Sequence, residues 1–178
     1  MRKAVFGLLL LAGLTLAQGA DYRQIALAAG ALARLQAVAQ GVQGEAKLLD
    51  WAKAVQARAE KDFADKAYFK AAREAQAALF LYRAAQGEPQ VRAPARMGFH
   101  PGHGPRDWGW RGRAVPQLAE RARRAVDRAE KELAYYRAQD ALVKDLVAEA
   151  KARLEKEPGR ALLLAQAALA LVSAERGF

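Results

Sequence analysis

A segment that occurs twice decides the fold: KDFADKAYFKAAREAQAALFLYRAAQG (Lys61–Gly87) and KARLEKEPGRALLLAQAALALVSAERG (Lys151–Gly177). The two copies align without gaps at an offset of 90 residues, with 11 of 27 positions identical. Both contain the string AQAAL-x-L, and both end in glycine. Alanine and leucine at helical spacing predict an α-helix for most of each copy. We therefore expect an all-α fold that arose by duplication of a helical unit.

A longer apolar pattern precedes each copy. From residue 25 to residue 63, apolar residues recur every three or four positions, which is the spacing of one helix face. Gly41 and Gly44 lower the helix propensity, but the spacing of the apolar residues continues across them. We therefore expect one continuous helix here, with a kink or break as the alternative. The second pattern, from Val115 to about Leu154, predicts one long helix that begins at Pro116.

These patterns predict two tandem helical hairpins, over residues 20–87 and 115–178, each with a long helix followed by a shorter one. A Pro-, Gly- and Trp-rich loop, residues 88–114, joins them. Four such helices close into a four-helix bundle or stack as a short solenoid. The shorter helices are expected from about Asp65 to Gln86, with Asp62 or Asp65 as the cap and Gly87 and Pro89 at the end, and from Pro158 to Gly177.

The alanine spacing of the first short helix resembles the second half of a tetratricopeptide-type repeat. The residues that carry this resemblance are Tyr68, Ala71, Ala75, Ala78, Tyr82, Ala85 and Pro89. The hairpins, over residues 25–87 and 120–177, also resemble small uncharacterised bacterial envelope proteins with duplicated helical hairpins. The chain departs from tetratricopeptides in its 90-residue period, against 34, and in lacking their Trp/Gly signature. The resemblance implies a scaffold or interaction role and no catalytic residues.

Residues 1–19 have the layout of a secretory signal peptide. Two cations, Arg2 and Lys3, precede an apolar run over residues 4–16, and small residues follow at Ala17 and Gly19. The apolar run is shorter than the roughly 20 residues that span a bilayer. We expect cleavage before Ala20 or Gln18, with an uncleaved anchor as the alternative, and a mature chain in the periplasm or outside the cell that has no transmembrane helix.

Composition limits the chemistry of the chain. It has no cysteine, which excludes disulfides, thiolate metal sites and cysteine nucleophiles. The formal net charge is +10, and loss of Arg2 and Lys3 with the signal peptide leaves +8. A basic balance favours anionic partners such as DNA, acidic glycans or lipid headgroups, although an Arg-rich proteome gives the same balance.

The loop 88–114 is the first candidate site. Its cations alternate with aromatic residues, a pattern that pairs with phosphates while the rings stack on bases or sugars. The alternative is a connector whose two tryptophans pack over the end of the bundle. The candidate binding residues are Arg106, Trp108, Trp110, Arg111 and Arg113.

The same loop holds His100 and His103, with Asp107 nearby. Two imidazoles and a carboxylate suit zinc, copper or nickel, but nothing supplies a fourth ligand at a suitable spacing. We therefore expect no metal site. The charged stretch over residues 120–132 consists of opposite charges four positions apart, which is typical of a solvated, self-paired helix face.

Residues 161–174 are apolar on nearly every side of their expected helix. A helix of this kind lies at the centre of a fold or is covered by a partner. We expect it to contact the matching segment, residues 71–84. With three other helices in the chain, complete covering by one copy is doubtful, so a homodimer or a protein partner is plausible.

Enzymatic motifs are absent from the sequence. Both histidines lie within one loop, and neither a phosphate-binding G-x-x-x-x-G-K-[ST] string nor an H-E-x-x-H string occurs. We expect no cofactor. The sequence favours an exported, non-catalytic helical interaction or scaffold protein of the periplasm or cell envelope. The alternatives are a protein that binds anionic polymers through residues 88–114 and, less favoured, a periplasmic holdase chaperone.

Overall fold

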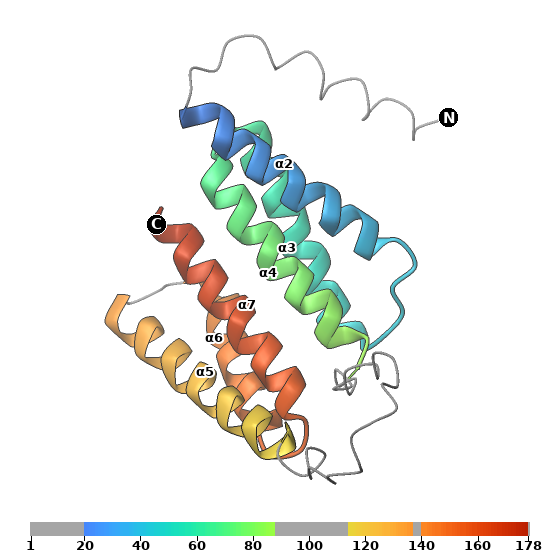
Figure 1. The fold of residues 1–178 in the computed structure, drawn as a ribbon, viewed down its shortest axis with the longest axis vertical. Helices are drawn as coiled ribbons and strands as arrows, with labels where there is room; N and C mark the ends of the chain where they lie inside the picture. The colour runs from blue at the N-terminus through green and yellow to red at the C-terminus, as the bar shows by residue number, and fades with distance from the viewer. Residues whose placement is uncertain (1–19, 88–113, 137–139, 178) are drawn as a thin grey trace, which may run out of the picture.

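The computed structural model describes residues 20–87, 114–136 and 140–177. These residues form six α-helices and no strand, which confirms the predicted all-α class (Figure 1). None of these helices is long and apolar enough to cross a membrane. The helices are α2 (Ala20–Ala39), α3 (Ala46–Ala64), α4 (Tyr68–Ala85), α5 (Ala114–Tyr136), α6 (Ala141–Arg153) and α7 (Pro158–Arg176).

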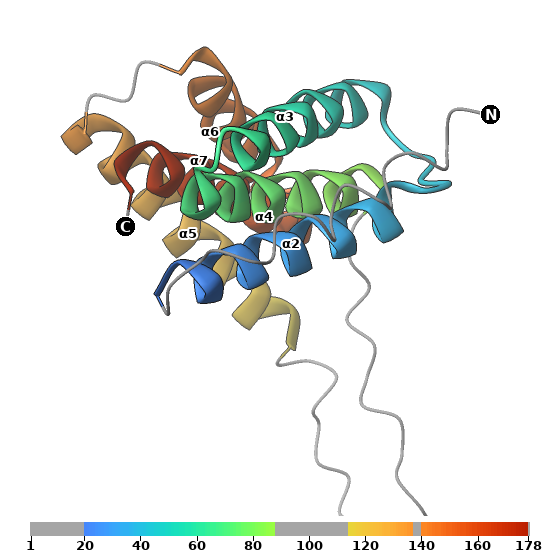
Figure 2. The same ribbon diagram turned by 90° about the horizontal axis from the view of Figure 1, so that it is seen from above.

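The helices are arranged in three layers. The middle layer is the pair α4 and α7, which run antiparallel and contact each other along their length (Figure 1). Helices α3 and α6 cover one side of this pair, and α2 and α5 cover the other side (Figure 2). Each outer helix packs on the central helix of its own half, so the contact between the halves is made mainly by α4 and α7.

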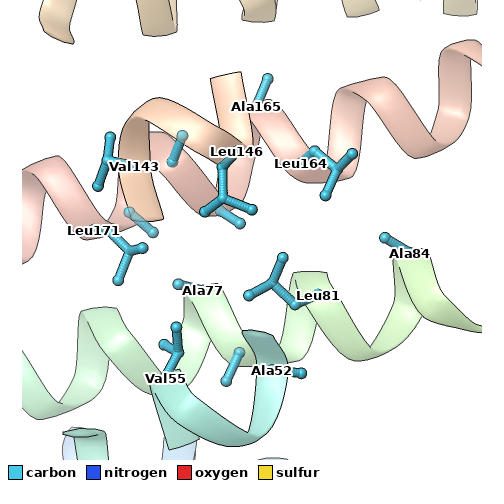
Figure 3. Packing of buried hydrophobic residues seen from close by; sticks show 14 of the residues in the cluster. Ala52, Val55, Ala77, Leu81, Ala84, Val143, Leu146, Leu164, Ala165 and Leu171 are labelled. Carbon is cyan, nitrogen blue, oxygen red and sulfur yellow. The ribbon is translucent and has the colours of Figure 1, made fainter. Parts of the chain in front are cut away.

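The core lies where α4 and α7 meet their neighbours (Figure 3). Leu81 of α4 and Leu164 and Leu171 of α7 are almost completely buried, with 0–1% of their surface exposed. Alanines fill most of the remaining buried positions of both helices, and their small side chains let the two helix backbones approach closely. Val55 of α3 and Leu146 of α6 close the core from the outer layer.

Each half contains the same three-helix unit, in the order α2, α3, α4 and then α5, α6, α7. The central helices keep the 90-residue offset seen in the sequence, since α4 begins at Tyr68 and α7 at Pro158. The buried residues of α3 and α6 correspond at an offset of 91, because the stretch from Ala150 to Ala161 is one residue shorter than the matching stretch from Ala59 to Ala71. The matched buried pairs are Ala52 and Val143, Val55 and Leu146, and Ala59 and Ala150.

The first long helix that the sequence favours is in fact two helices. Helix α2 ends at Ala39, and α3 begins at Ala46. Gly41 adopts a φ of 81°, a left-handed conformation that no regular helix contains. The neighbouring amide of Glu45 donates a hydrogen bond of 3.1 Å to the carbonyl oxygen of Ala85, at the end of α4. The chain therefore breaks here because its backbone docks against another helix.

The prediction of a second long helix, from Val115 to about Leu154, is also wrong. Helix α5 ends at Tyr136 and α6 begins at Ala141. The carboxylate of Asp140 caps α6 by accepting a 2.9 Å hydrogen bond from the amide of Leu142. Each half therefore contains three helices where the sequence predicts a long-and-short pair.

The predicted cap of α4 is wrong, and its predicted end is correct. Ala67 occupies the N-cap position and no side chain caps it. Asp62 instead pairs with Lys70 at 2.9 Å, and Asp65 ends α3. Gly87 follows the last turn of α4 with a φ of 127°, while Pro89 lies outside the described residues.

The apolar character of α7 follows from its central position. Helix α7 packs against α4, α5 and α6, so three helices of the same chain cover it. The predicted contact between α7 and α4 is confirmed. The chain itself covers most of the helix but not all of it, and a homodimer stays a prediction. Some surface of Leu162, Leu163 and Leu169 remains open to solvent.

Candidate functional site

The residues that the sequence analysis selected lie outside the part of the chain that the structure describes. This applies to the binding candidates of the loop (Arg106, Trp108, Trp110, Arg111 and Arg113) and to the weak metal-ligand candidates (His100, His103 and Asp107). Among residues 20–87, 114–136 and 140–177, no group of three or more His, Cys, Asp or Glu side chains could hold a metal ion. The described helices nevertheless contain three polar features of interest.

The first feature is an open groove at the contact between the two halves. It has a volume of about 470 Å³, and its walls come from α4, α5 and α7. Phe80 and Leu169 contribute apolar surface, and Gln76, Gln166 and Ser173 contribute polar groups. Gln76 and Gln166 are equivalent positions of the repeat, so the duplication places the same amide on both central helices.

Three arginines, one from each helix, line this groove: Arg73 of α4, Arg128 of α5 and Arg176 of α7. Glu132 is the only carboxylate among the described lining residues, and its Oε1 accepts a 2.7 Å hydrogen bond from Nε of Arg128. The described part of the groove therefore carries an excess of positive charge. We name it the arginine groove.

Two of these arginines lie against aromatic rings. Arg73 lies over the ring of Phe69, 5.2 Å from its centroid, and donates a weak 3.4 Å hydrogen bond to Oε1 of Gln76. Arg176 lies 3.1 Å from the ring centroid of Tyr136. The ring and the amide orient the Arg73 guanidinium without cancelling its charge. The described lining contains no histidine or cysteine.

The charge pattern of α5 is confirmed only in part. Arg124 pairs with Glu120 and Arg128 with Glu132, as the sequence predicts. Arg123 instead reaches Glu155 beyond the end of α6, at 3.0 Å. Arg128 lies on the charged face that was predicted to be solvated, and 71% of its side chain is exposed. Because α7 packs beside α5, the same residue also lines the groove. Only the tertiary arrangement brings it beside Arg73 and Arg176.

The second feature is Glu74 of α4, the only charged side chain among the described residues with no exposed surface. Nε of Arg58, on α3, lies 3.3 Å from its Oε1. Burial, and next the nearby carboxylate of Asp62, raise the pKa of Glu74 to about 7, although Arg58 and Lys70 act in the opposite direction. Glu74 therefore exchanges its proton near neutral pH.

The partners of Glu74 connect the two halves. Burial opposes ionisation of Asp62, but hydrogen bonds from Lys70 and from Glu74 hold its pKa below the ordinary value. The Nη1 atom of Arg58 donates a 2.6 Å hydrogen bond to Asp140, the residue that caps α6. Arg58 thus joins a buried carboxyl group of the first half to a helix start of the second half.

The third feature is a cluster of ion pairs around Arg153, the last residue of α6. Its guanidinium binds both carboxylate oxygens of Glu45 in the first half, at 2.6 and 2.9 Å. It also donates to Glu149 at 2.6 Å and to Glu157 at 3.0 Å. The hydrogen bond to Glu45 is the main cause that raises the pKa of Arg153. Lys47 completes the cluster through a 2.6 Å contact with Glu149.

Replacing Arg153 by methionine tests this cluster. Only 16% of the Arg153 side chain is exposed, and its loss would leave Glu149 with Lys47, and Glu45 and Glu157 with Arg160. We expect Arg153→Met to lower the free energy of unfolding by about 2 kcal/mol at neutral pH, less than for a fully buried pair because solvent screens part of the interaction. Chemical denaturation measures the change.

The matched control is Arg124→Met, which removes an exposed pair on α5. Its expected effect is about 0.5 kcal/mol or less. The hydrogen bond from Lys47, and next that from Arg153, lower the pKa of Glu149, so the cluster stabilises the fold above the ordinary carboxylate pKa of 4.5 and loses this contribution in acid. Equal effects of the two variants would show that the cluster contributes no more than a surface pair.

Comparison of the chain with protein-family models, with curated proteins and with solved structures finds no match in any of the three.

Proposed function

We propose that this chain is an exported helical interaction protein of the periplasm or cell envelope that binds a partner without catalysing a reaction. The observation that carries the proposal is the arginine groove, which lies where the two copies of the helical unit meet. A duplicated scaffold with an open, positively charged groove at its centre is suited to receiving another molecule. Export is supported by the signal-peptide layout of residues 1–19.

The absence of catalytic groups in the described region also supports a binding role. The buried polar residues, Glu74 and its neighbours, lie between α3, α4 and α6, away from the lining of the groove. Catalysis of acyl or phosphoryl transfer would need a nucleophile, a base and an anion site within reach of one another. The described groove contains one serine, Ser173, and its one carboxylate, Glu132, is paired with Arg128.

The export part of the proposal predicts a new N-terminus. Chain purified from the envelope fraction of its native host should begin at Gln18, Ala20 or Asp21, as read by N-terminal sequencing. A chain that begins at Met1 and is found in the cytoplasm would contradict export. The same chain expressed without residues 1–19 serves as the size standard.

The interaction part predicts a stoichiometric complex. Mature chain fixed on a support should retain a protein from an envelope extract, and the purified pair should elute together from a size-exclusion column at a defined ratio. A turnover measured on small-molecule substrates, or no co-eluting partner, would count against this function. Light scattering of the mature chain alone distinguishes a homodimer from a complex with a different protein.

A further inference from the structure

Two carboxyl groups beside the contact between the halves have the arrangement of a proton-binding site. We propose that Asp62 and Glu74 share one proton, and that release of this proton to water weakens the ion pair between Arg58 and Asp140 that joins the two halves. The cluster is then a pH-sensitive link built into the fold. The inference goes beyond the proposed function, and its test on the purified chain depends neither on export nor on a partner.

The surroundings of Glu74 require a proton. Its side chain has no exposed surface, and neither of its carboxyl oxygens accepts a hydrogen bond from a described residue. The carboxyl group nevertheless hydrogen-bonds to Asp62. Two ionised carboxylates are both acceptors, so they hydrogen-bond to each other only when one of them keeps its proton. Glu74 is the more deeply buried of the two, since 14% of the Asp62 side chain is exposed, and it therefore carries the proton.

The charge balance of the cluster also calls for one proton. Two described cations face three carboxyl groups, and these five groups come from α3, α4 and the N-cap of α6. The cations are Arg58 and Lys70, and the carboxyl groups are Asp62, Glu74 and Asp140. With all three carboxyl groups ionised, the cluster would carry an excess negative charge beside a fully buried side chain, which is costly. A single proton on Glu74 makes the cluster neutral.

The second half of the chain provides an internal comparison. At the repeat position of Glu74, 90 residues along the chain, stands the buried Leu164. The ion pairs around Arg153 also join the halves, but there the described cations and carboxylates are equal in number. The cations are Lys47, Arg153 and Arg160, and the carboxylates are Glu45, Glu149 and Glu157. The second cluster is therefore balanced without a proton.

Arg58 connects the shared proton to the contact between the halves. Its Nη1 donates to Asp140 at 2.6 Å, whereas its Nε lies 3.3 Å from Oε1 of Glu74. While Glu74 is neutral, the charge of Arg58 serves Asp140. When the proton leaves, Glu74 becomes a carboxylate without water around it and competes for the same guanidinium. Asp140 has some exposed surface and can turn to water, so its bond to Arg58 weakens.

The first measurement follows the side-chain carboxyl carbons of Glu74 and Asp62 by NMR, in the full mature chain between about pH 5 and about pH 9. We expect both signals to move in one shared step near pH 7. Asp62→Asn replaces the shared proton by an amide N–H, so it should move the Glu74 step down by about one pH unit or more. The matched control, Asp50→Asn, removes an exposed carboxylate of α3 and should leave the step in place.

The second measurement is a double-mutant cycle between Arg58→Met and Asp140→Asn, read by denaturant unfolding at about pH 5.5 and about pH 8.5. Asparagine keeps the helix cap and removes the charge. We expect the two changes to be coupled by about tenfold in the unfolding constant at the lower pH, and by about threefold or less at the higher pH. In a Glu74→Gln background the coupling should be equal at both pH values. The matched cycle, between Arg153→Met and Glu45→Gln, should also not change with pH.

Each part of the inference can fail separately. A Glu74 signal that does not move over this pH range would show that no proton is exchanged there, and an unchanged step in Asp62→Asn would show that the proton is not shared. Equal coupling between Arg58 and Asp140 at both pH values, or the same fall in the Glu74→Gln background, would overturn control of the contact by this proton. Arg58→Gln takes the place of Arg58→Met if the methionine variant does not fold.

Discussion

Replacement of Gly44 by alanine is expected to lower the free energy of unfolding by about 3 kcal/mol, through overpacking against a backbone that cannot move away. A Cβ atom at Gly44 would lie 2.0 Å from the carbonyl oxygen of Ala85 and 2.5 Å from its carbonyl carbon. Both are backbone atoms at the end of α4, the central helix of the first half. Relief of the clash would separate the start of α3 from α4.

The matched control is Gly30→Ala in α2. A Cβ atom at Gly30 meets no atom within 4 Å, and the residue lies inside a regular helix. Alanine there should stabilise the protein by about 1 kcal/mol, because it forms a helix more readily than glycine. Thermal and denaturant unfolding of the two variants should therefore move in opposite directions.

A Gly44→Ala variant as stable as the wild type would contradict the close approach of the two backbones. The hydrogen bond from the amide of Glu45 to the carbonyl oxygen of Ala85 would then not form as described. If both glycine variants stabilise the protein, residues 40–45 would instead behave as the interior of the continuous helix that the apolar phase predicts.

These glycines show where the sequence stops predicting the fold. Helices α4 and α7 could be recognised because an uninterrupted apolar pattern, a duplication and a terminal glycine all indicate the same bounds. The break between α2 and α3 could not be recognised from the sequence, because the spacing of the apolar residues continues unchanged across it. Gly44 is needed for a contact with Ala85, forty-one positions along the chain, and no local pattern reports a contact at that distance.

The limits of local patterns also explain why the predicted candidate site differs from the groove that the structure contains. A binding site was predicted over residues 106–113 because aromatic and cationic residues alternate there. The groove assembles residues from Arg73 to Arg176, more than a hundred positions apart, most of which are ordinary helix-surface residues. The equivalence of Gln76 and Gln166 in the duplicated segment was the one available signal. The role of the loop stays a prediction.

The second large effect concerns Glu74 and the pH dependence of the free energy of unfolding. The direction of this effect follows from the raised pKa of Glu74. The pKa is about 7 in the folded chain, against an ordinary value of 4.5. Below about 4.5, Glu74 is protonated in both states and does not affect stability. As the pH rises from 4.5 to 7, the unfolded chain releases the proton while the folded chain retains it, so stability falls. Above 7 the loss is complete, at about 3 kcal/mol.

Replacing Glu74 by glutamine removes this loss. A glutamine has nearly the same shape, its amide can donate to Asp62, and its oxygen can accept from Arg58. We expect Glu74→Gln to raise the free energy of unfolding by about 3 kcal/mol at about pH 8 and to leave it unchanged at about pH 4. Because Glu74 and Asp62 shift each other's pKa, the difference between the two pH profiles reports this pair.

Glu149→Gln supplies a control of opposite sign. The pKa of Glu149 is lowered, chiefly by the hydrogen bond from Lys47, so its carboxylate stabilises the folded state at neutral pH and its removal should destabilise. Denaturant unfolding between about pH 4 and pH 8 measures all three chains. Parallel profiles for the wild type and Glu74→Gln would show that Glu74 is ionised across this range. The ion pair with Arg58 would then outweigh burial, and the link through Arg58 to Asp140 would stabilise the contact between the two halves without responding to pH.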